Sequence, residues 1–257
     1  MRKYPEKYLE VLKNEVNIIE NNGVKIIFKP SPGEKRDGYL DPCEKEIMDG
    51  HWASKSNDKE ENQKDVKENV DKSMENDEMT TLDMVISTIR DSMGFPNYNL
   101  NTVEIYTKFE TITDSGNEVG LWRYYPRNLD RNKNNKALVF FHGGGWIGGT
   151  TYVVENFCKL IAEKANCVVF NVDYSLAPEK PYPNGLNDNY YAVKHIYDNA
   201  EKYRIDKSKI AVAGDSAGGN YAAAISLKAR DEEVPMIALQ VLIYPAVAIG
   251  NACVQGY

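Results

Sequence analysis

The chain has 257 residues, 42% of them hydrophobic, which suits one large domain or one domain with a small appendage. Its formal net charge of −7 argues against nucleic acids and anionic membrane surfaces as partners. No apolar run approaches the ~18 residues that span a bilayer, and the charged N-terminus lacks the apolar core of a signal peptide. Four cysteines without C-x-x-C spacing indicate reduced, structural thiols in a cytoplasmic protein.

The first hundred residues alternate between helical and irregular patterns. Apolar side chains recur at helical spacing over residues 5–20, which predicts an amphipathic helix. Residues 54–78 are highly charged, and we expect a flexible insertion that buries almost nothing. A second helix is expected over residues 81–93, where Gly94 is placed to end it.

The pattern changes near residue 103. Residues 103–113 and 119–125 are rich in β-branched and aromatic side chains, and the turn-forming residues 114–117 separate them, so they are expected to form a hairpin. Strands and helices then alternate. The expected strands are 137–141, 167–173, 210–213 and 237–244, and the expected helices are 152–165, 186–203 and 221–230. This alternation is typical of an open, mostly parallel sheet with helices on both faces.

One of these strands, which begins at Ile210, ends abruptly in Gly-Asp-Ser-Ala-Gly, residues 214–218. A G-x-S-x-G sequence between a strand and a helix holds its serine on a sharp turn with the hydroxyl exposed. The residues on either side are small because larger side chains would collide with the neighbouring strand or the helix. Ser216 is therefore a candidate nucleophile. The alternative is a glycine-rich turn that carries an incidental serine.

A second glycine-rich segment, His142-Gly-Gly-Gly-Trp146, directly follows the strand that ends at residue 141. Three consecutive glycines leave the backbone unencumbered, so successive N–H groups can point into one cavity. Acyl transfer needs such donors where negative charge develops on the carbonyl oxygen. Two glycine N–H groups, together with the N–H group of Ala217, would form this oxyanion hole. The alternative is a flexible glycine-rich loop.

A dinucleotide-binding fingerprint is a rival interpretation of the same glycines. Gly143, Gly145 and Gly148 fit G-x-G-x-x-G, and Asp173 ends the next strand 25 residues after Gly148. Against this interpretation, the expected helix begins only after Thr151, and the serine motif is left unexplained. The sequence has no Gly-Lys dipeptide for a Walker P-loop and no metal-ligand cluster, so neither a cofactor nor a metal is expected.

A third motif, Asp-Tyr-Ser-Leu-Ala-Pro-Glu at residues 173–179, lies between the other two. In this order, the motifs at residues 142–146, 173–179 and 214–220 resemble those of the hormone-sensitive-lipase-like branch of the α/β-hydrolases. The resemblance covers roughly residues 100–246. It implies an α/β-hydrolase fold, a serine esterase or lipase that acts on small-molecule esters with mostly small acyl groups, and an N-terminal lid over the active site.

The resemblance also assigns roles to individual residues. It implies that Ser216 is the nucleophile that forms the acyl-enzyme. The implied oxyanion-hole donors are the N–H groups of Gly144, Gly145 and Ala217. The supporting residues are His142, Gly143 and Asp215. His142 resembles the motif histidine that props the glycine loop, and Asp215 is expected to be a positioning residue, because a side chain adjacent to the nucleophile on a sharp turn reaches its proton poorly.

The resemblance stops short of a complete catalytic triad. In α/β-hydrolases the triad acid and then the histidine follow the serine along the chain, whereas His51, His142 and His195 all precede Ser216. We therefore expect an N-terminal helical cap over residues 1–100 and an incomplete core over residues 101–257, ended by truncation or a frameshift before the C-terminal strands. Catalysis should then be impaired.

Ending the core there also has a structural consequence. The apolar segment 236–249 should be left as an exposed edge of the sheet. A non-catalytic ligand-binding homologue remains the main alternative function, with a dinucleotide-binding protein behind it. The sequence leaves open the acyl and alcohol specificity, the role of the charged insertion and the oligomeric state, a homo-oligomer included.

Overall fold

The computed structural model describes residues 17–21, 24–28, 81–93, 97–114 and 116–247. The chain divides into two units, Met1–Thr80 and Thr81–Tyr257. The charged insertion expected over residues 54–78 lies outside the described residues. The expected N-terminal cap stays a prediction, and its last twenty residues, 81–100, belong to the same unit as the sheet.

The first unit contains a hairpin where the sequence analysis expected a helix. Strands β1 (Asn17–Asn21) and β2 (Val24–Phe28) pair antiparallel, with Asn21 opposite Val24. The helix expected over residues 5–20 is therefore wrong for its last four residues, and its earlier part lies outside the described residues. The physical reason is readable in the sequence, because two segments rich in β-branched isoleucine flank Asn-Gly, the dipeptide typical of two-residue hairpin turns.

The second unit opens with the helix and the hairpin that the sequence predicts. Helix α3 spans Thr81–Ser92, within one residue of the expected range, and Ile86 on it is buried. Strands β3 (Ile105–Asp114) and β4 (Asn117–Pro126) form the antiparallel hairpin, within two residues of the expected bounds at each end.

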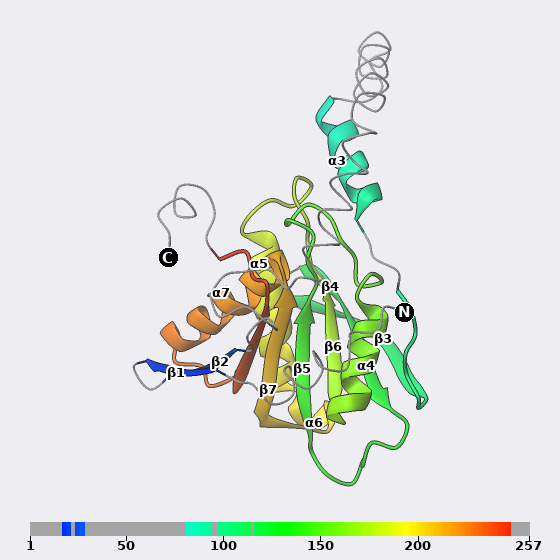
Figure 1. Ribbon diagram of the computed structural model, residues 1–257, viewed down its shortest axis with the longest axis vertical. Helices are drawn as coiled ribbons and strands as arrows, with labels where there is room; N and C mark the ends of the chain where they lie inside the picture. Colours follow the sequence, from blue (N-terminus) through cyan, green and yellow to red (C-terminus); the bar gives the residue numbers. More distant parts are fainter. Residues whose placement is uncertain (1–16, 22–23, 29–80, 94–96, 115, 248–257) are drawn as a thin grey trace. The chain divides into compact units, whose positions relative to one another are not determined.

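A six-stranded sheet forms the centre of this unit, in the order β3-β4-β6-β5-β7-β8 (Figure 1). The remaining strands are β5 (Asn135–Phe141), β6 (Val168–Asp173), β7 (Ile205–Asp215) and β8 (Leu239–Ile243). Strand β4 is antiparallel to its neighbours β3 and β6. Strands β5, β6, β7 and β8 are parallel to one another. The mostly parallel sheet of the α/β fold is confirmed.

Helices connect the parallel strands, as predicted, but several bounds differ. They are α4 (Glu155–Ala165), α5 (Asn184–Asp198), α6 (Ala200–Tyr203) and α7 (Ala217–Asp231). The single helix expected over residues 186–203 is divided at Asn199. Asn199 is the C-cap residue of the first helix, and its side-chain amide shares the carbonyl of His195 with its own backbone N–H.

The elements on either side of the serine turn are also longer than expected. Strand β7 begins five residues before Ile210, and helix α7 begins at Ala217, directly after the serine. Helix α4, in contrast, begins three residues later than expected. The chain therefore passes from strand to helix with Ser216 as the single residue between them.

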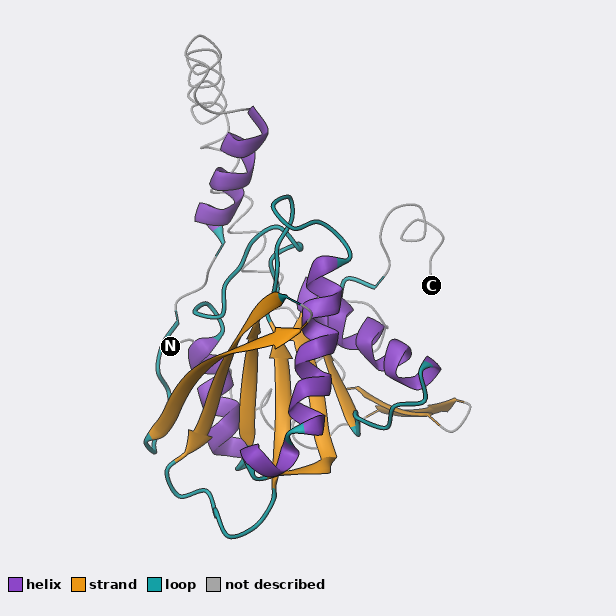
Figure 2. Cartoon of the chain, turned by 180° about the vertical axis from the view of Figure 1, so that it is seen from behind, coloured by secondary structure: helices purple, strands orange, loops and turns teal. Residues whose placement is uncertain are grey.

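Two apolar layers cover the two faces of the sheet, and Figure 2 shows helices in front of the strands and behind them. Alternate residues of β5 supply both layers because side chains of a strand point to opposite faces. Phe140 lies in a cluster with Cys158 and Ala162 of α4. Phe141 lies in the other cluster, with residues of α5 and α7 such as Ile196 and Ile225.

Strand β8 is the last strand of the sheet among the described residues. Three of its apolar side chains are exposed, and Leu239 has a relative exposure of 60%. Only Met236, just before the strand, is fully buried in this segment. The expectation of an exposed apolar edge is confirmed for the described residues up to 247.

Because the central strands are buried, replacing a phenylalanine in the core should lower the free energy of unfolding much more than replacing one on the surface. Phe170 on β6 is fully buried and packs edge-on against Tyr203, with ring centroids 5.1 Å apart. Replacing Phe170 by Ala should lower the free energy of unfolding by about 3–5 kcal/mol through lost burial and a residual cavity. Urea denaturation followed by circular dichroism measures the change.

The matched control is Phe109→Ala on strand β3, since that ring is 52% exposed. It should cost about 1 kcal/mol or less. Equal losses for the two variants would contradict the assignment of the core.

Candidate active site

The glycine-rich loop and the serine turn meet at one edge of the sheet. Strands β5 and β7 are parallel neighbours, with Phe141 opposite Gly214. The carboxyl ends of the two strands therefore lie side by side, and the residues that follow them, His142 and Asp215–Ser216, emerge next to each other. Ligand sites of open α/β sheets lie outside this edge.

Ser216 occupies a strained backbone position. Its φ of 51° and ψ of −115° lie in a region that side chains rarely adopt, and it is the N-cap residue of α7. Three backbone hydrogen bonds of 3.0 Å hold it there: its N–H donates to Ile243, and its carbonyl accepts from Asn220 and Ala246. The residue is half-buried. This is the geometry expected of a serine on a strand-to-helix turn.

Close packing around the turn explains the small residues on both sides of Ser216. A Cβ atom added to Gly218 would lie 2.0 Å from the carbonyl oxygen of Phe141. One added to Gly214 would lie 2.3 Å from the backbone of Gly218. Both positions therefore require glycine, because helix α7 starts in direct contact with the end of β5.

A hydrogen bond joins the serine turn to the glycine loop. The N–H group of Gly143 donates to a carboxylate oxygen of Asp215 over 2.9 Å. A Cβ atom on Gly143 would lie 2.4 Å from the other carboxylate oxygen, so a larger residue would break this contact. Burial raises the pKa of Asp215, while the hydrogen bond from Gly143 opposes that rise.

The side chain of His142 is buried and holds the glycine loop in position. Its ring stacks on Tyr174, with centroids 4.3 Å apart, and its Nδ1 donates to the carbonyl of Gly143 over 2.8 Å. The Tyr174 hydroxyl donates to the carbonyl of His142 over 2.6 Å. Burial lowers the pKa of His142 to about 4, so the ring is neutral at pH 7.

Gly144 and Gly145 follow with backbone conformations that favour glycine. Their φ angles are +136° and +62°. The carbonyl of Gly144 accepts a hydrogen bond of 2.9 Å from the N–H of Gly148, which closes a tight turn. The N–H groups of Gly144 and Gly145 donate to no other residue in the described part of the chain. These two donors are therefore available to a ligand.

Ala217 contributes a third available donor. It is the first residue of α7, and the first N–H groups of a helix have no partner within the helix. The positive end of the helix dipole adds to their effect on a negatively charged atom. Within the described part of the chain, unpaired backbone donors from two neighbouring loops therefore lie at this edge of the sheet, and acyl transfer requires donors of this kind where an oxyanion forms.

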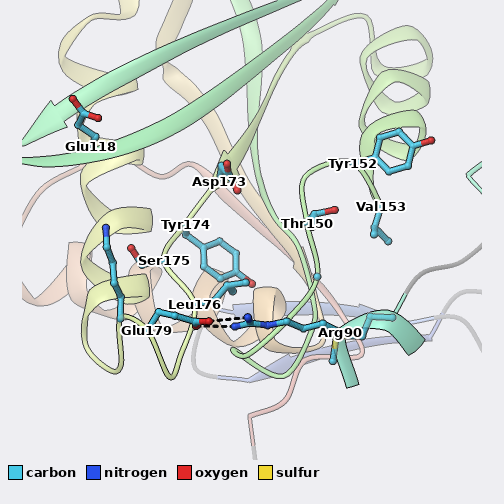
Figure 3. Close-up of a pocket in the computed structure, with 13 residues that line it drawn as sticks. Arg90, Glu118, Thr150, Tyr152, Val153, Asp173, Tyr174, Ser175, Leu176 and Glu179 are labelled. Carbon is cyan, nitrogen blue, oxygen red and sulfur yellow. Dashed lines mark hydrogen bonds and ion pairs between the residues drawn. The ribbon is translucent and has the colours of Figure 1, made fainter. Parts of the chain in front are cut away.

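Arg90 of α3 contacts two of the loops at this edge, and the sequence analysis missed it. Its guanidinium pairs with both carboxylate oxygens of Glu179 over 2.8 Å (Figure 3). It also donates to the carbonyls of Ile147, over 2.6 Å, and Ala177, over 3.1 Å. The pair with Arg90 lowers the pKa of Glu179 to about 2. An arginine on an amphipathic helix is usually solvated, and only the acidic end of the motif at residues 173–179 pointed to a basic partner.

A cavity of about 680 Å³ lies beside these loops, and Figure 3 shows Asp173, Tyr174 and Arg90 around it. Burial raises the pKa of Asp173. Ser216 does not line this cavity. The residues invoked for dinucleotide binding are also arranged differently from that fingerprint, because α4 begins at Glu155, seven residues after Gly148, and no helix starts within the glycine run.

His195 is not brought to Ser216. His195 on α5 contacts the hydroxyl of Tyr203 over 3.1 Å and packs edge-on against Tyr191. His51 lies outside the described residues. Within the described part of the chain no group of three or more side chains could hold a metal ion. No helix in that part is long and apolar enough to cross a bilayer.

Comparisons with known proteins agree with this geometry. Residues 138–254 match the family of proteins with an alpha/beta hydrolase fold. The chain is 43% identical over 112 residues to the carboxylesterase NlhH of Mycobacterium tuberculosis, covering 44% of this chain and 35% of that protein. It is 38% identical over 128 residues to the esterase LipI of the same organism, covering 50% and 40%.

Among solved structures, the chain is similar to a hyperthermophilic esterase from Pyrobaculum calidifontis. The TM-score is 0.53 at 35% identity, over 64% of this chain and 48% of that one. The chain thus spans less than half the length of these relatives. The region matched by the family, residues 138–254, contains the glycine loop, the motif at residues 173–179 and the serine turn. On these motifs, this fold and these relatives, the chain has an α/β-hydrolase fold and is similar to esterases of the branch that resembles hormone-sensitive lipase.

Proposed function

We propose that the protein is a serine hydrolase of small carboxylic esters that acts through an acyl-enzyme on Ser216. The observation that carries the proposal is the contact between the two motifs, in which the Gly143 N–H group binds the carboxylate of Asp215 next to the serine. This contact holds the glycine loop against the turn that bears the hydroxyl. The esterases among the relatives support the choice of ester over other acyl substrates.

The proposed oxyanion hole consists of the N–H groups of Gly144, Gly145 and Ala217. Gly143 is not a candidate, because its N–H group is already bound to Asp215. Attack of the Ser216 oxygen on the ester carbonyl forms a tetrahedral intermediate whose negative oxygen accepts hydrogen bonds from these donors. Collapse of the intermediate expels the alcohol and leaves the acyl group on the serine, and water then releases the acid.

The proton of Ser216 needs a base, and neither described histidine supplies it. The Nδ1 of His142 is bound to Gly143, and His195 is bound to Tyr203. We therefore propose that these 257 residues on their own hydrolyse esters slowly. Loss of triad members leaves roughly 10³- to 10⁴-fold acceleration over water, from the oxyanion hole and binding alone.

The engagement of both described histidines away from Ser216 also favours the second candidate, a protein that binds an ester-like ligand without turning it over. The two candidates differ at one atom, since only the hydrolase forms a covalent bond between the Ser216 oxygen and the acyl group. The free, buried thiols of Cys158 and Cys167 support a reducing, cytoplasmic location for either. No nucleic-acid partner is proposed for either candidate, because the chain has a net charge of −7.

Serine replacement tests the nucleophile. Ser216→Ala should abolish the protein-dependent hydrolysis of a chromogenic acetate ester and the covalent adduct with a serine-directed phosphonate, measured by mass spectrometry. Added imidazole should raise the rate of the unaltered chain more than that of Ser216→Ala, because the small base can take the serine proton. The matched control is Ser226→Ala, on the same helix, whose hydroxyl donates to the carbonyl of Ala222.

Two results would count against these proposals. Tight, unreactive ligand binding with no adduct would favour the second candidate. High activity without imidazole, lost in Ser216→Ala, would refute the account of the missing base.

The bond between Asp215 and Gly143 makes a prediction of its own. Asp215→Ala leaves the half-buried Gly143 N–H group without its acceptor, which should cost about 1–3 kcal/mol of unfolding free energy. It should also slow formation of the Ser216 adduct. Asp215→Asn, which keeps an oxygen acceptor at the same position, should retain most of both properties. Equal behaviour of the two variants would show that the hydrogen bond is not what matters.

The buried, neutral ring of His142 predicts a pH dependence of stability. Its pKa is about 4 in the folded chain and about 6.5 when unfolded, so its contribution is fully present above pH 6.5 and is lost as the pH falls toward 4. Between pH 7 and pH 5 this amounts to about 2 kcal/mol. The comparison of urea unfolding with His142→Phe, which keeps the stacking on Tyr174, isolates the contribution. An NMR titration of His142 that shows a pKa near 6.5 would contradict the assignment.

A further inference from the structure

A second cavity, of about 200 Å³, lies at the other end of the sheet from Ser216. Strand β5 begins there, at Asn135, and Figure 1 shows α6 and the loop that enters β5 at this lower end. Ten residues line the cavity and none is acidic. Its five cationic residues are Lys108, Arg123, Arg131, Lys202 and Arg204. We call this site the basic cavity, and its charge contrasts with the chain's net −7.

Two of the cations face each other directly. Lys108 on β3 is paired with Arg123 on β4 in the antiparallel register. Like charges opposite each other on neighbouring strands destabilise the pair. The acid that contacts this cluster, Glu110, is bound to the ammonium of Lys202 over 2.9 Å. Among the described residues, Glu110 is therefore the one carboxylate that forms a hydrogen bond with these five cationic residues.

The guanidinium of Arg123 is fixed in place but incompletely bonded. It lies 5.1 Å from the ring centroid of Tyr203 and 5.7 Å from that of Tyr125. Its Nε atom is buried and has no hydrogen-bond partner among the described residues. Buried donors are almost always paired, so the guanidinium of Arg123 is short of one acceptor within the described part of the protein.

A neighbouring arginine is held by the same aromatic surface. The guanidinium of Arg131 lies 5.1 Å from the centroid of Tyr125 and 5.5 Å from that of Tyr106. Stacking on aromatic rings orients these planar groups before any ligand arrives, so less freedom is lost on binding. Rigid guanidinium donors match the oxygens of a phosphate group better than ammonium groups do.

We propose that the basic cavity binds a small multivalent oxyanion, the phosphate or pyrophosphate group of a small molecule. The ligand neutralises the facing cations, and its oxygens accept hydrogen bonds from Arg123 and Arg131. The small volume suits such a group, whereas the acidic chain as a whole repels extended polyanions. This site does not depend on the proposed ester hydrolysis, and it lies at the opposite end of the parallel strands.

Calorimetric titration of the full chain tests the proposal with three probes at constant ionic strength: inorganic phosphate, pyrophosphate and phenyl phosphate. Saturable binding at one site is expected for at least one of them. Arg123→Gln should weaken it by about tenfold or more, since hydrogen bonds between charged groups are lost. Arg131→Gln and Lys108→Gln, at exposed positions, should weaken it in the same direction. Added sodium chloride should also weaken it.

The matched control is Lys228→Gln on α7, which removes a cation that does not line the basic cavity and should leave the affinity unchanged. If Arg123→Gln fails to fold, the Arg131 and Lys108 variants decide the matter. Tighter binding of phenyl phosphate than of the inorganic ions would identify a phosphate ester as the ligand, and the reverse would identify a free ion. No saturable binding of any of the three probes, or unchanged affinity in the cavity variants, would overturn the proposal.

Discussion

The hydrogen bond between the Gly143 N–H group and the Asp215 carboxylate is the constraint on which the site depends. It connects the first residues after β5 with the last residue of β7, and it does so from the residue next to the serine. Because this bond occupies the N–H group of Gly143, the N–H groups of Gly144 and Gly145 are the glycine donors that remain for a ligand. The acid beside Ser216 is thus committed to the loop, and its role is to hold the loop in position.

Three loops leave the same edge of the sheet, and polar contacts between them set their positions. Tyr174, after β6, stacks on His142 after β5 and donates to its carbonyl. Arg90 joins α3 to the glycine loop and to the loop after β6. The apolar clusters on the two faces hold the strands, whereas these contacts hold the residues beyond the strand ends. The geometry of the candidate site therefore rests on a polar layer above an apolar one.

Much of the sheet could be predicted because its physical causes are local. Apolar runs of five to seven residues, bounded by turn formers, identified β5 and β6, and the alternation with helices predicted their parallel pairing. The adjacency of the two glycine-rich motifs depends in addition on the strand order, in which β5 lies between β6 and β7, and the alternation of elements does not predict that order. The serine strain at φ 51° and the contact of Gly218 with Phe141 are consequences of the same close approach.

The features that the sequence analysis missed depend on competition between local sequence signals or on contacts between segments that are far apart in the sequence. The hairpin of β1 and β2 was missed because helical spacing over residues 8–19 outweighed the Asn-Gly signal that follows it. The break at Asn199 depends on an amide that caps His195, which periodicity does not register. The basic cavity is assembled from residues 108 to 204, and no segment of the sequence is basic enough to reveal it.

One irregularity in the sheet separates its two ends. Against β5, the register jumps from Asn135 opposite Ile205 to Ala137 opposite Ile210, so residues 206–209 face the single residue Lys136 and three extra residues are accommodated as a bulge at the start of β7. Bulges absorb extra residues where they occur and leave the following ladder in phase. Length changes at this entry to the strand would therefore leave the serine turn in place. The lower end of the sheet can therefore change in length while the upper end keeps its geometry.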